Sequence, residues 1–110
     1  MNEKKEFELI ENSIGENNID LSIEKVYAFI INLQDYNTDI YHEGLYRLGE
    51  LLFEKFEETS DNKDACEAII TLSSAYNSYL FKNNKVSDKY ALAIQKTRDS
   101  YFKKNTKPIK

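Results

Sequence analysis

Glycine and proline are nearly absent from this chain, and their scarcity limits what it can fold into. The 110 residues include three glycines and one proline, Pro108, which lies two residues from the carboxyl end. Proteins built of strands and tight turns need glycine and proline at those turns, whereas helices need neither. The hydrophobic share of 41% and the charged share of 31% are typical of a globular chain and not of a disordered one. The sequence therefore predicts an all-α fold.

Apolar residues recur at helical spacing in five segments, which short polar connectors separate. The predicted helices span about residues 3–14, 20–36, 38–59, 61–82 and 87–102. Candidate N-caps for the last four are Asp20 or Ser22, Asn37 or Thr38, Ser60 or Asp61, and Ser87. Short connectors favour antiparallel neighbours, so we expect about five antiparallel helices in a compact bundle or short helical array. Residues 1–110 are predicted to form a single helical domain, with residues 103–110 as a frayed tail.

Two of these helices have informative faces. The second is apolar over much of its circumference, which is typical of a central helix. The third has a clean apolar stripe made of Tyr41, Leu45, Leu48, Leu52 and Phe56. Almost opposite lies an acidic stripe made of Glu43, Glu50, Glu54 and Glu57, with Tyr46 and Phe53 between the two. Gly44 and Gly49 within this helix predict a close approach of a neighbouring helix, at a propensity cost of roughly 1 kcal/mol each.

The charge is divided unevenly along the chain. Residues 1–64 hold sixteen acidic and six basic residues, a net charge of −10, whereas residues 65–110 hold three and nine, a net charge of +6. Part of this division could be internal, with acidic and basic helices side by side. Exposed ion pairs contribute only about 0–1 kcal/mol each, so steering of a charged partner is a stronger reason for the pattern.

The acidic stripe of the third helix has two interpretations. It could be an ordinary solvated face, or it could be a docking surface for a basic protein. Tyrosine and phenylalanine beside it favour docking, because they bury a large area with few rotatable bonds. The predicted partner-binding residues are Asp35, Asp39, Glu43, Tyr46, Glu50, Phe53, Glu54 and Glu57.

The single cysteine, Cys66, excludes an internal disulfide and any CxxC motif. We expect it to be a small buried hydrophobe in a reducing compartment. The amino terminus lacks the apolar stretch of a signal peptide, and no apolar run approaches the roughly 18 residues of a membrane span. These features predict a cytoplasmic protein with no membrane partner.

Catalytic and nucleic-acid-binding patterns are not evident. Asp39-x-x-His42-Glu43 has the acid-x-x-His spacing of a helical di-metal site, but such sites use two histidines and His42 is the only one. We therefore interpret His42 as a surface residue near a helix start. Glycine-rich phosphate loops are absent from the sequence, and two arginines with a pI near 5.0 argue against nucleic-acid binding. We expect no enzyme activity, no metal, no cofactor and no nucleic acid.

Small size, acidic helices with bordering aromatics, and a composition rich in Lys, Asn, Ile and Tyr together resemble the immunity proteins of bacterial toxin systems, such as the antidotes to contact-dependent or polymorphic toxins. The resemblance covers the character of the whole chain and no motif. It implies a non-enzymatic inhibitor that neutralises a cognate basic toxin domain, typically a nuclease, in a one-to-one complex. An acidic face would mimic phosphate charge and speed capture.

Two alternatives stay open. Leu48-Gly49-x-x-Leu52 and Leu72-Ser73-x-x-Tyr76 resemble the first helix of a tetratricopeptide repeat, although they lie 24 residues apart and that repeat has a period of 34. The chain could therefore be a helical adaptor that recruits a protein or peptide. An immunity protein against a pore-forming bacteriocin is the other alternative, and it would require association with membranes.

Overall fold

A computed structural model describes residues 2–106, and it confirms the all-α prediction for this part of the chain. Five α-helices and one short 3₁₀ helix account for its regular structure. In chain order they are α1 (Glu3–Ser13), η1 (Ile14–Glu16), α2 (Ile19–Ile31), α3 (Asp39–Thr59), α4 (Asn62–Asn83) and α5 (Asp88–Asn105).

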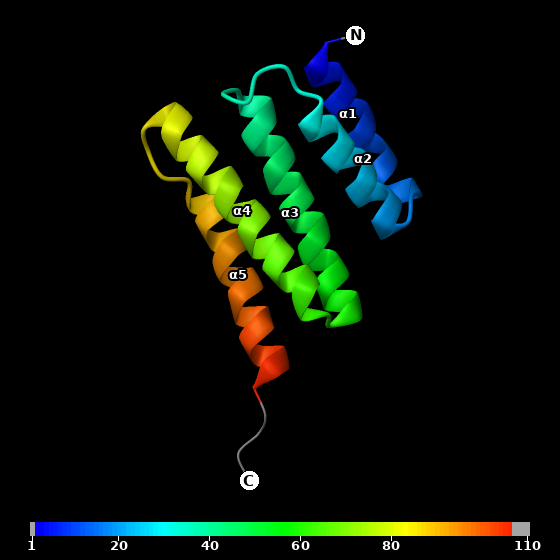
Figure 1. The fold of residues 1–110 in the computed structure, drawn as a ribbon, viewed down its shortest axis with the longest axis vertical. Coiled ribbons are helices and arrows are strands. Elements are labelled where there is room, and N and C mark those ends of the chain that lie inside the picture. Colours follow the sequence, from blue (N-terminus) through cyan, green and yellow to red (C-terminus); the bar gives the residue numbers. More distant parts are fainter. Residues whose placement is uncertain (1, 107–110) are drawn as a thin grey trace.

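The helices form a flattened, elongated array in which sequential neighbours run antiparallel (Figure 1). The helix α3 is central: it packs most extensively on α4, then on α2, while α1 lies outside α2 and α5 packs mainly on α4. The array measures 58 × 35 × 17 Å, and its radius of gyration is 14.8 Å, compared with about 13 Å for a compact chain of 100 residues. Because α3, and not α2, is the most extensively packed helix, the prediction that the second helix is central is wrong. Its wide apolar stripe instead leaves Tyr27 and Ile31 half exposed.

Side-chain caps set most helix starts. Thr38, Asp61 and Ser87 each accept a hydrogen bond from a backbone N–H in the first turn, as their sequence positions predicted. The helix α2 differs, because Asn18 caps it through the N–H of Leu21, earlier than the two predicted candidates. It also ends at Ile31, where residues 33–37 form an irregular connector in place of the predicted last turn.

The predicted frayed tail is partly wrong. Residues 103–105 belong to α5, because Lys104 Nζ donates to the backbone oxygens of Phe56 and Glu57 and to the hydroxyl of Ser60. These contacts tie the last turn of α5 to the carboxyl end of α3. Residues 107–110 of the predicted tail lie outside the described residues.

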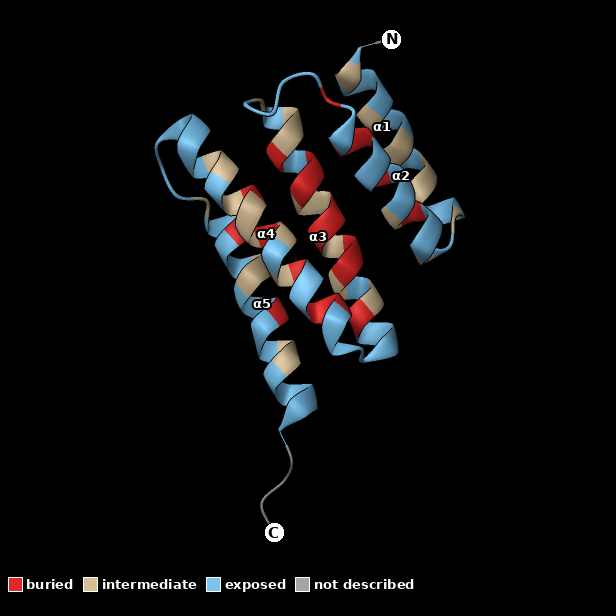
Figure 2. Cartoon of the chain, in the orientation of Figure 1, coloured by how far each residue is buried: buried red, intermediate tan, exposed pale blue. Residues whose placement is uncertain are grey.

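The core follows the apolar stripe of α3 and the faces that cover it (Figure 2). Leu45, Leu48, Leu52 and Phe56 are buried as the stripe predicted, while Tyr41 is partly buried. Leu51 lies off the stripe and is only 1% exposed. Because α2 and α4 pack on different sides of α3, this helix buries more of its circumference than one stripe.

The two glycines of α3 confirm the predicted close helix approaches. A Cβ atom added to Gly44 would lie 3.1 Å from Cγ1 of Ile30 in α2. One added to Gly49 would lie 2.5 Å from both Cγ and Cδ2 of Leu72 in α4. The second separation is too short for real atoms, so α3 and α4 can pack this closely only with glycine at position 49.

We predict that Gly49→Ala lowers the free energy of unfolding by about 1–2 kcal/mol, because the clash with Leu72 outweighs the roughly 1 kcal/mol that alanine contributes through helix propensity. Urea denaturation followed by circular dichroism measures the change. The control is Gly15→Ala, where an added Cβ meets no atom within 4 Å. Equal stability of the two variants would contradict the close-packing argument.

Candidate functional site

A groove of about 690 Å³ lies between α3 and α5. It exists because α5 packs along α4 and makes few contacts with α3. The side of α3 that lines it carries Tyr46, Arg47, Glu50, Phe53, Glu54 and Glu57. The side of α5 carries Lys89, Leu92, Ala93, Lys96 and Thr97. Leu72 of α4, which is 1% exposed, contributes to the lining from below.

The helices α3 and α5 run in the same direction (Figure 1), and side-chain contacts between them keep a constant register. Lys89 Nζ lies 4.5 Å from the ring centroid of Tyr46, and Lys96 Nζ lies 5.4 Å from that of Phe53. Further along, Ser100 donates a hydrogen bond of 3.1 Å to Glu57. In all three of these contacts the residue of α5 lies 43 positions after its partner in α3. Each helix therefore presents one continuous face to the groove, with residues at spacings of three and four.

Five of the eight predicted partner-binding residues line this groove: Tyr46, Glu50, Phe53, Glu54 and Glu57. Tyr46 and Phe53 are partly buried and lie beneath lysines of α5, so they form part of the wall and do not project freely. Exposed Glu43 lies next to the groove, in a smaller hollow that it shares with Lys89.

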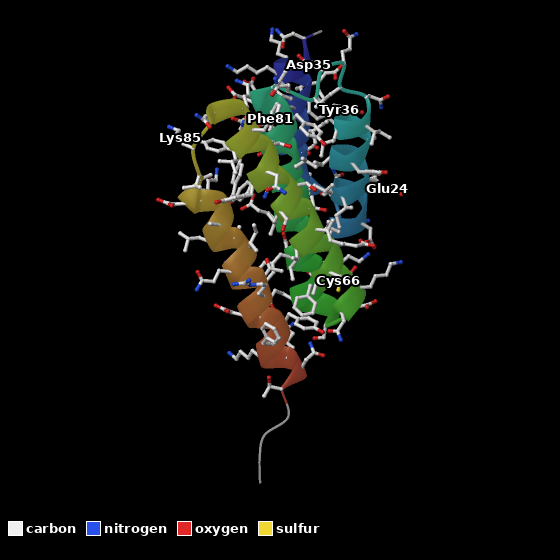
Figure 3. The ribbon with its side chains drawn as sticks, turned by 60° about the vertical axis from the view of Figure 1, so that its left-hand side comes forward. Glu24, Asp35, Tyr36, Cys66, Phe81 and Lys85 are labelled. Carbon is white, nitrogen blue, oxygen red and sulfur yellow. The ribbon has the colours of Figure 1, made fainter. Side chains whose placement is uncertain are left out.

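The other two predicted residues, Asp35 and Asp39, do not line the groove. Asp39 pairs with Lys82 of α4 at 3.3 Å and with His42 at 3.1 Å. Asp35 lines a separate hollow with Tyr36 and Phe81, toward one end of the molecule (Figure 3). The structure thus distributes the predicted patch over two regions.

The acidic wall is already partly neutralised from within the chain. Glu50 pairs with Arg47 at 3.3 Å, and Glu57 pairs with Lys104 at 3.2 Å. Glu54 is exposed and has no ion pair among residues 2–106. Across the groove stand Lys89 and Lys96, so the two rims carry opposite charges.

The sequence did not predict this basic wall, because the charge division does not say which basic helix lies opposite the acidic stripe. The signal was present in the division between an acidic first part and a basic last part of the chain. Two of the ion pairs, Lys82 with Asp39 and Lys104 with Glu57, join those parts directly. Part of the division is therefore internal pairing.

His42 is buried, 3% exposed, and the interpretation of it as a surface residue is wrong. It lies under α4 and α5, with edge contacts to the rings of Tyr79 and Tyr90. Nε2 lies 3.1 Å from Oδ1 of Asp39, and Nδ1 lies 2.9 Å from the hydroxyl of Tyr90. An ionised carboxylate only accepts, so Nε2–H donates to Asp39; when the imidazole is neutral, its unprotonated Nδ1 accepts from the hydroxyl of Tyr90.

Burial and charge act on the two partners of His42 in ways that keep this arrangement. The hydrogen bond from His42, followed by that from Lys82, lowers the pKa of the exposed Asp39 carboxyl. Burial raises the pKa of Tyr90, so its hydroxyl stays protonated at neutral pH and remains a donor. The pair His42–Tyr90 is thus a polar link between α3 and α5 just beyond the groove.

Cys66 is exposed on α4 (Figure 3), so the expectation that it is buried is wrong. Within residues 2–106, no cluster of three or more His, Cys, Asp or Glu side chains has a geometry that could hold a metal ion. In the same range no helix has the length and apolar character needed to cross a membrane.

Comparisons of this chain with protein-family models, with curated protein sequences and with solved structures find no match. The groove and its chemistry are therefore the basis for assigning a function.

We predict that Tyr90→Phe lowers the free energy of unfolding by about 1–2 kcal/mol, because Nδ1 of buried His42 loses its donor. Chemical denaturation at neutral pH measures it. Tyr79→Phe is the matched control: its ring also contacts His42, but its hydroxyl makes no hydrogen bond within residues 2–106. Equal losses in the two variants would show that the hydroxyl of Tyr90 contributes nothing specific.

Proposed function

We propose that this chain is a non-enzymatic protein-binding domain that acts as an immunity protein, holding a cognate toxin domain in a one-to-one inhibitory complex. The observation that carries the proposal is the groove between α3 and α5, which is preformed, apolar in its floor and charged along its rims. The resemblance in size and character to toxin antidotes supplies the biological role.

The lining of the groove suits a protein partner. Leu92 is 63% exposed at its edge, and Leu72 and Phe53 supply apolar surface within it. Aromatic and aliphatic residues in a depression are the usual anchors of a protein interface, and charged rims around them exclude water and orient the partner.

The acidic rim of α3 favours a partner with basic residues. Glu54 can pair with a basic group of the partner without first breaking an ion pair of its own within residues 2–106. Glu50 and Glu57 have solvent-accessible internal ion pairs, which stabilise the fold by only about 0–1 kcal/mol each. A basic toxin surface could therefore replace those internal partners at little cost, and the acidic rim would raise the rate of encounter.

The alternative is a helical adaptor that recruits a protein without inhibiting it. The observation that favours it is the lysine-bearing wall of α5, because a groove with rims of both signs is a poorer mimic of a nucleic-acid backbone than a uniformly acidic surface. Co-expression with the identified partner separates the two roles. An immunity protein restores growth of cells that make an active toxin, whereas an adaptor leaves the activity of its partner unchanged.

The first prediction from this proposal concerns the apolar edge of the groove. Leu92→Glu places a charge there, and we expect it to weaken partner affinity by at least about tenfold, as loss of an interface anchor does. The partner is identified by quantitative mass spectrometry of material captured by the tagged chain from its native host, and affinity is then measured by calorimetry.

The matched control is Leu9→Glu on α1, where the leucine is 56% exposed and lies outside the groove. Both substitutions affect exposed leucines, so both variants should fold with near-native stability. If Leu92→Glu and Leu9→Glu bind the partner equally well, the groove is not the binding site.

The second prediction concerns the acidic rim. Glu50→Lys combined with Glu54→Lys should slow association by about tenfold and flatten its dependence on salt, because the rim no longer attracts basic groups. Stopped-flow or surface plasmon resonance at several salt concentrations measures both effects.

Glu24→Lys combined with Glu67→Lys makes the same change in net charge at exposed residues of α2 and α4 that do not line the groove. It should alter association far less. Unchanged affinity and salt dependence in the Glu50, Glu54 variant would remove the acidic rim from the binding model.

A further inference from the structure

The shape of the groove limits its occupant. On α3 the lining runs from Tyr46 to Glu57, and on α5 from Lys89 to Thr97. At 1.5 Å per residue these stretches are about 16 Å and about 12 Å long, or two to three helical turns. The groove is therefore long enough for a short segment of secondary structure and is open along one side of the array.

Beyond the first turn of α5, the walls of the groove offer no backbone partners. Both walls are helices, and away from the helix ends their backbone N–H and C=O groups are paired within the helix. An extended segment lying there would leave its own backbone groups without partners against apolar side chains, which is unfavourable. A helix pairs its own backbone groups and can present an apolar face, as in other helix-in-groove complexes.

The floor has no free polar group that would orient a small molecule. Thr97 is 1% exposed, and its hydroxyl already donates to the backbone oxygen of Ala93 at 2.8 Å. Leu72 and Phe53 are apolar. Small-molecule sites usually place a few convergent polar groups among apolar ones, whereas here the charged groups stand on the rims.

The charges on the two rims of the groove indicate which charges the flanks of the occupant should have. Glu50, Glu54 and Glu57 face Lys89 and Lys96 across the groove, and α3, α4 and α5 already form three sides of a helical bundle. We propose that the groove binds an amphipathic helix of the partner, two to three turns long, with basic residues on the flank next to α3 and acidic residues on the flank next to α5. The incoming helix completes a four-helix bundle. This inference rests on the proposed function, in which the groove is the partner-binding site.

Three synthetic peptides of about 14 residues, a length that covers the groove with one turn to spare, test the inference. All have leucines along one helical face. The first has lysines on one flank and glutamates on the other, and the second has the same composition with lysine and glutamate mixed on both flanks. The third is the first peptide with a central proline, which disrupts the helix. Exchanging the two flanks would be uninformative, because a helix that enters in the opposite direction presents them in the same order.

Titrations of the isotopically labelled full chain, followed by methyl NMR, give both affinity and location. We expect the segregated peptide to shift the methyl signals of Leu72, Leu92 and Ala93. It should bind about tenfold more tightly than the mixed peptide, because several charged contacts of modest strength add along the flanks. The proline peptide should not saturate. Lys96→Glu should weaken binding of the segregated peptide and reduce its advantage over the mixed one.

Four results would overturn the inference. Equal affinity of the segregated and mixed peptides would show that the rims do not select the flanks. Equal affinity of the proline peptide would indicate an extended occupant. Shifts confined to other residues would place the helix elsewhere, and no binding at all would show that the groove does not accept such a helix.

Failure of the proposed function is distinguishable from failure of this inference. If Leu92→Glu abolishes partner capture while no helical peptide binds, the groove is the partner site and only the helical occupant is wrong. If Leu92→Glu and Leu9→Glu capture the partner equally well, the groove is not the partner site.

Discussion

The close packing of α3 and α4 at Gly49 is the contact on which the rest of the structure depends. Leu72 occupies the space that a side chain at position 49 would need. This draws together the two most extensively packed helices. The same leucine reaches the lining of the groove between α3 and α5. A single backbone-to-side-chain contact in the core therefore sets the depth of the surface where a partner would bind.

The groove lies between α3 and α5 because α5 packs mainly on α4 and meets α3 only through side chains. At one end the buried hydroxyl of Tyr90 forms a hydrogen bond with Nδ1 of His42. At the other, Lys104 bonds to backbone oxygens of Phe56 and Glu57. A buried polar contact must be geometrically correct to be stable, so the contact between Tyr90 and His42 fixes the register of the two helices at that end. Between these two contacts, Lys96 lies over the ring of Phe53 and Ser100 bonds to Glu57, while the small side chain of Ala93 leaves space for the groove.

Local features of this fold were predictable from sequence, and tertiary ones were not. The cap residues Thr38, Asp61 and Ser87 act on neighbouring backbone groups, so their role can be identified from a few adjacent positions. Burial of His42 and exposure of Cys66 depend instead on which helix covers which face. The acidic half of the candidate site was visible on α3 alone. Its basic half was not, because α5 enters the site through a parallel register that no local pattern encodes.

Under the proposed function, the divided charge of the chain contributes to both folding and binding. Internal pairs such as Lys104 with Glu57 help to place α5, yet exposed pairs of this kind stabilise a fold by only about 0–1 kcal/mol. Their weakness matters for function, because a partner can exchange them without unfolding the domain. The apolar contacts beneath, at Leu72 and Phe53, do not exchange and keep the groove in place. Rims of opposite charge then favour one orientation of an incoming segment over the other, so the charge pattern contributes specificity and rate while the core supplies stability.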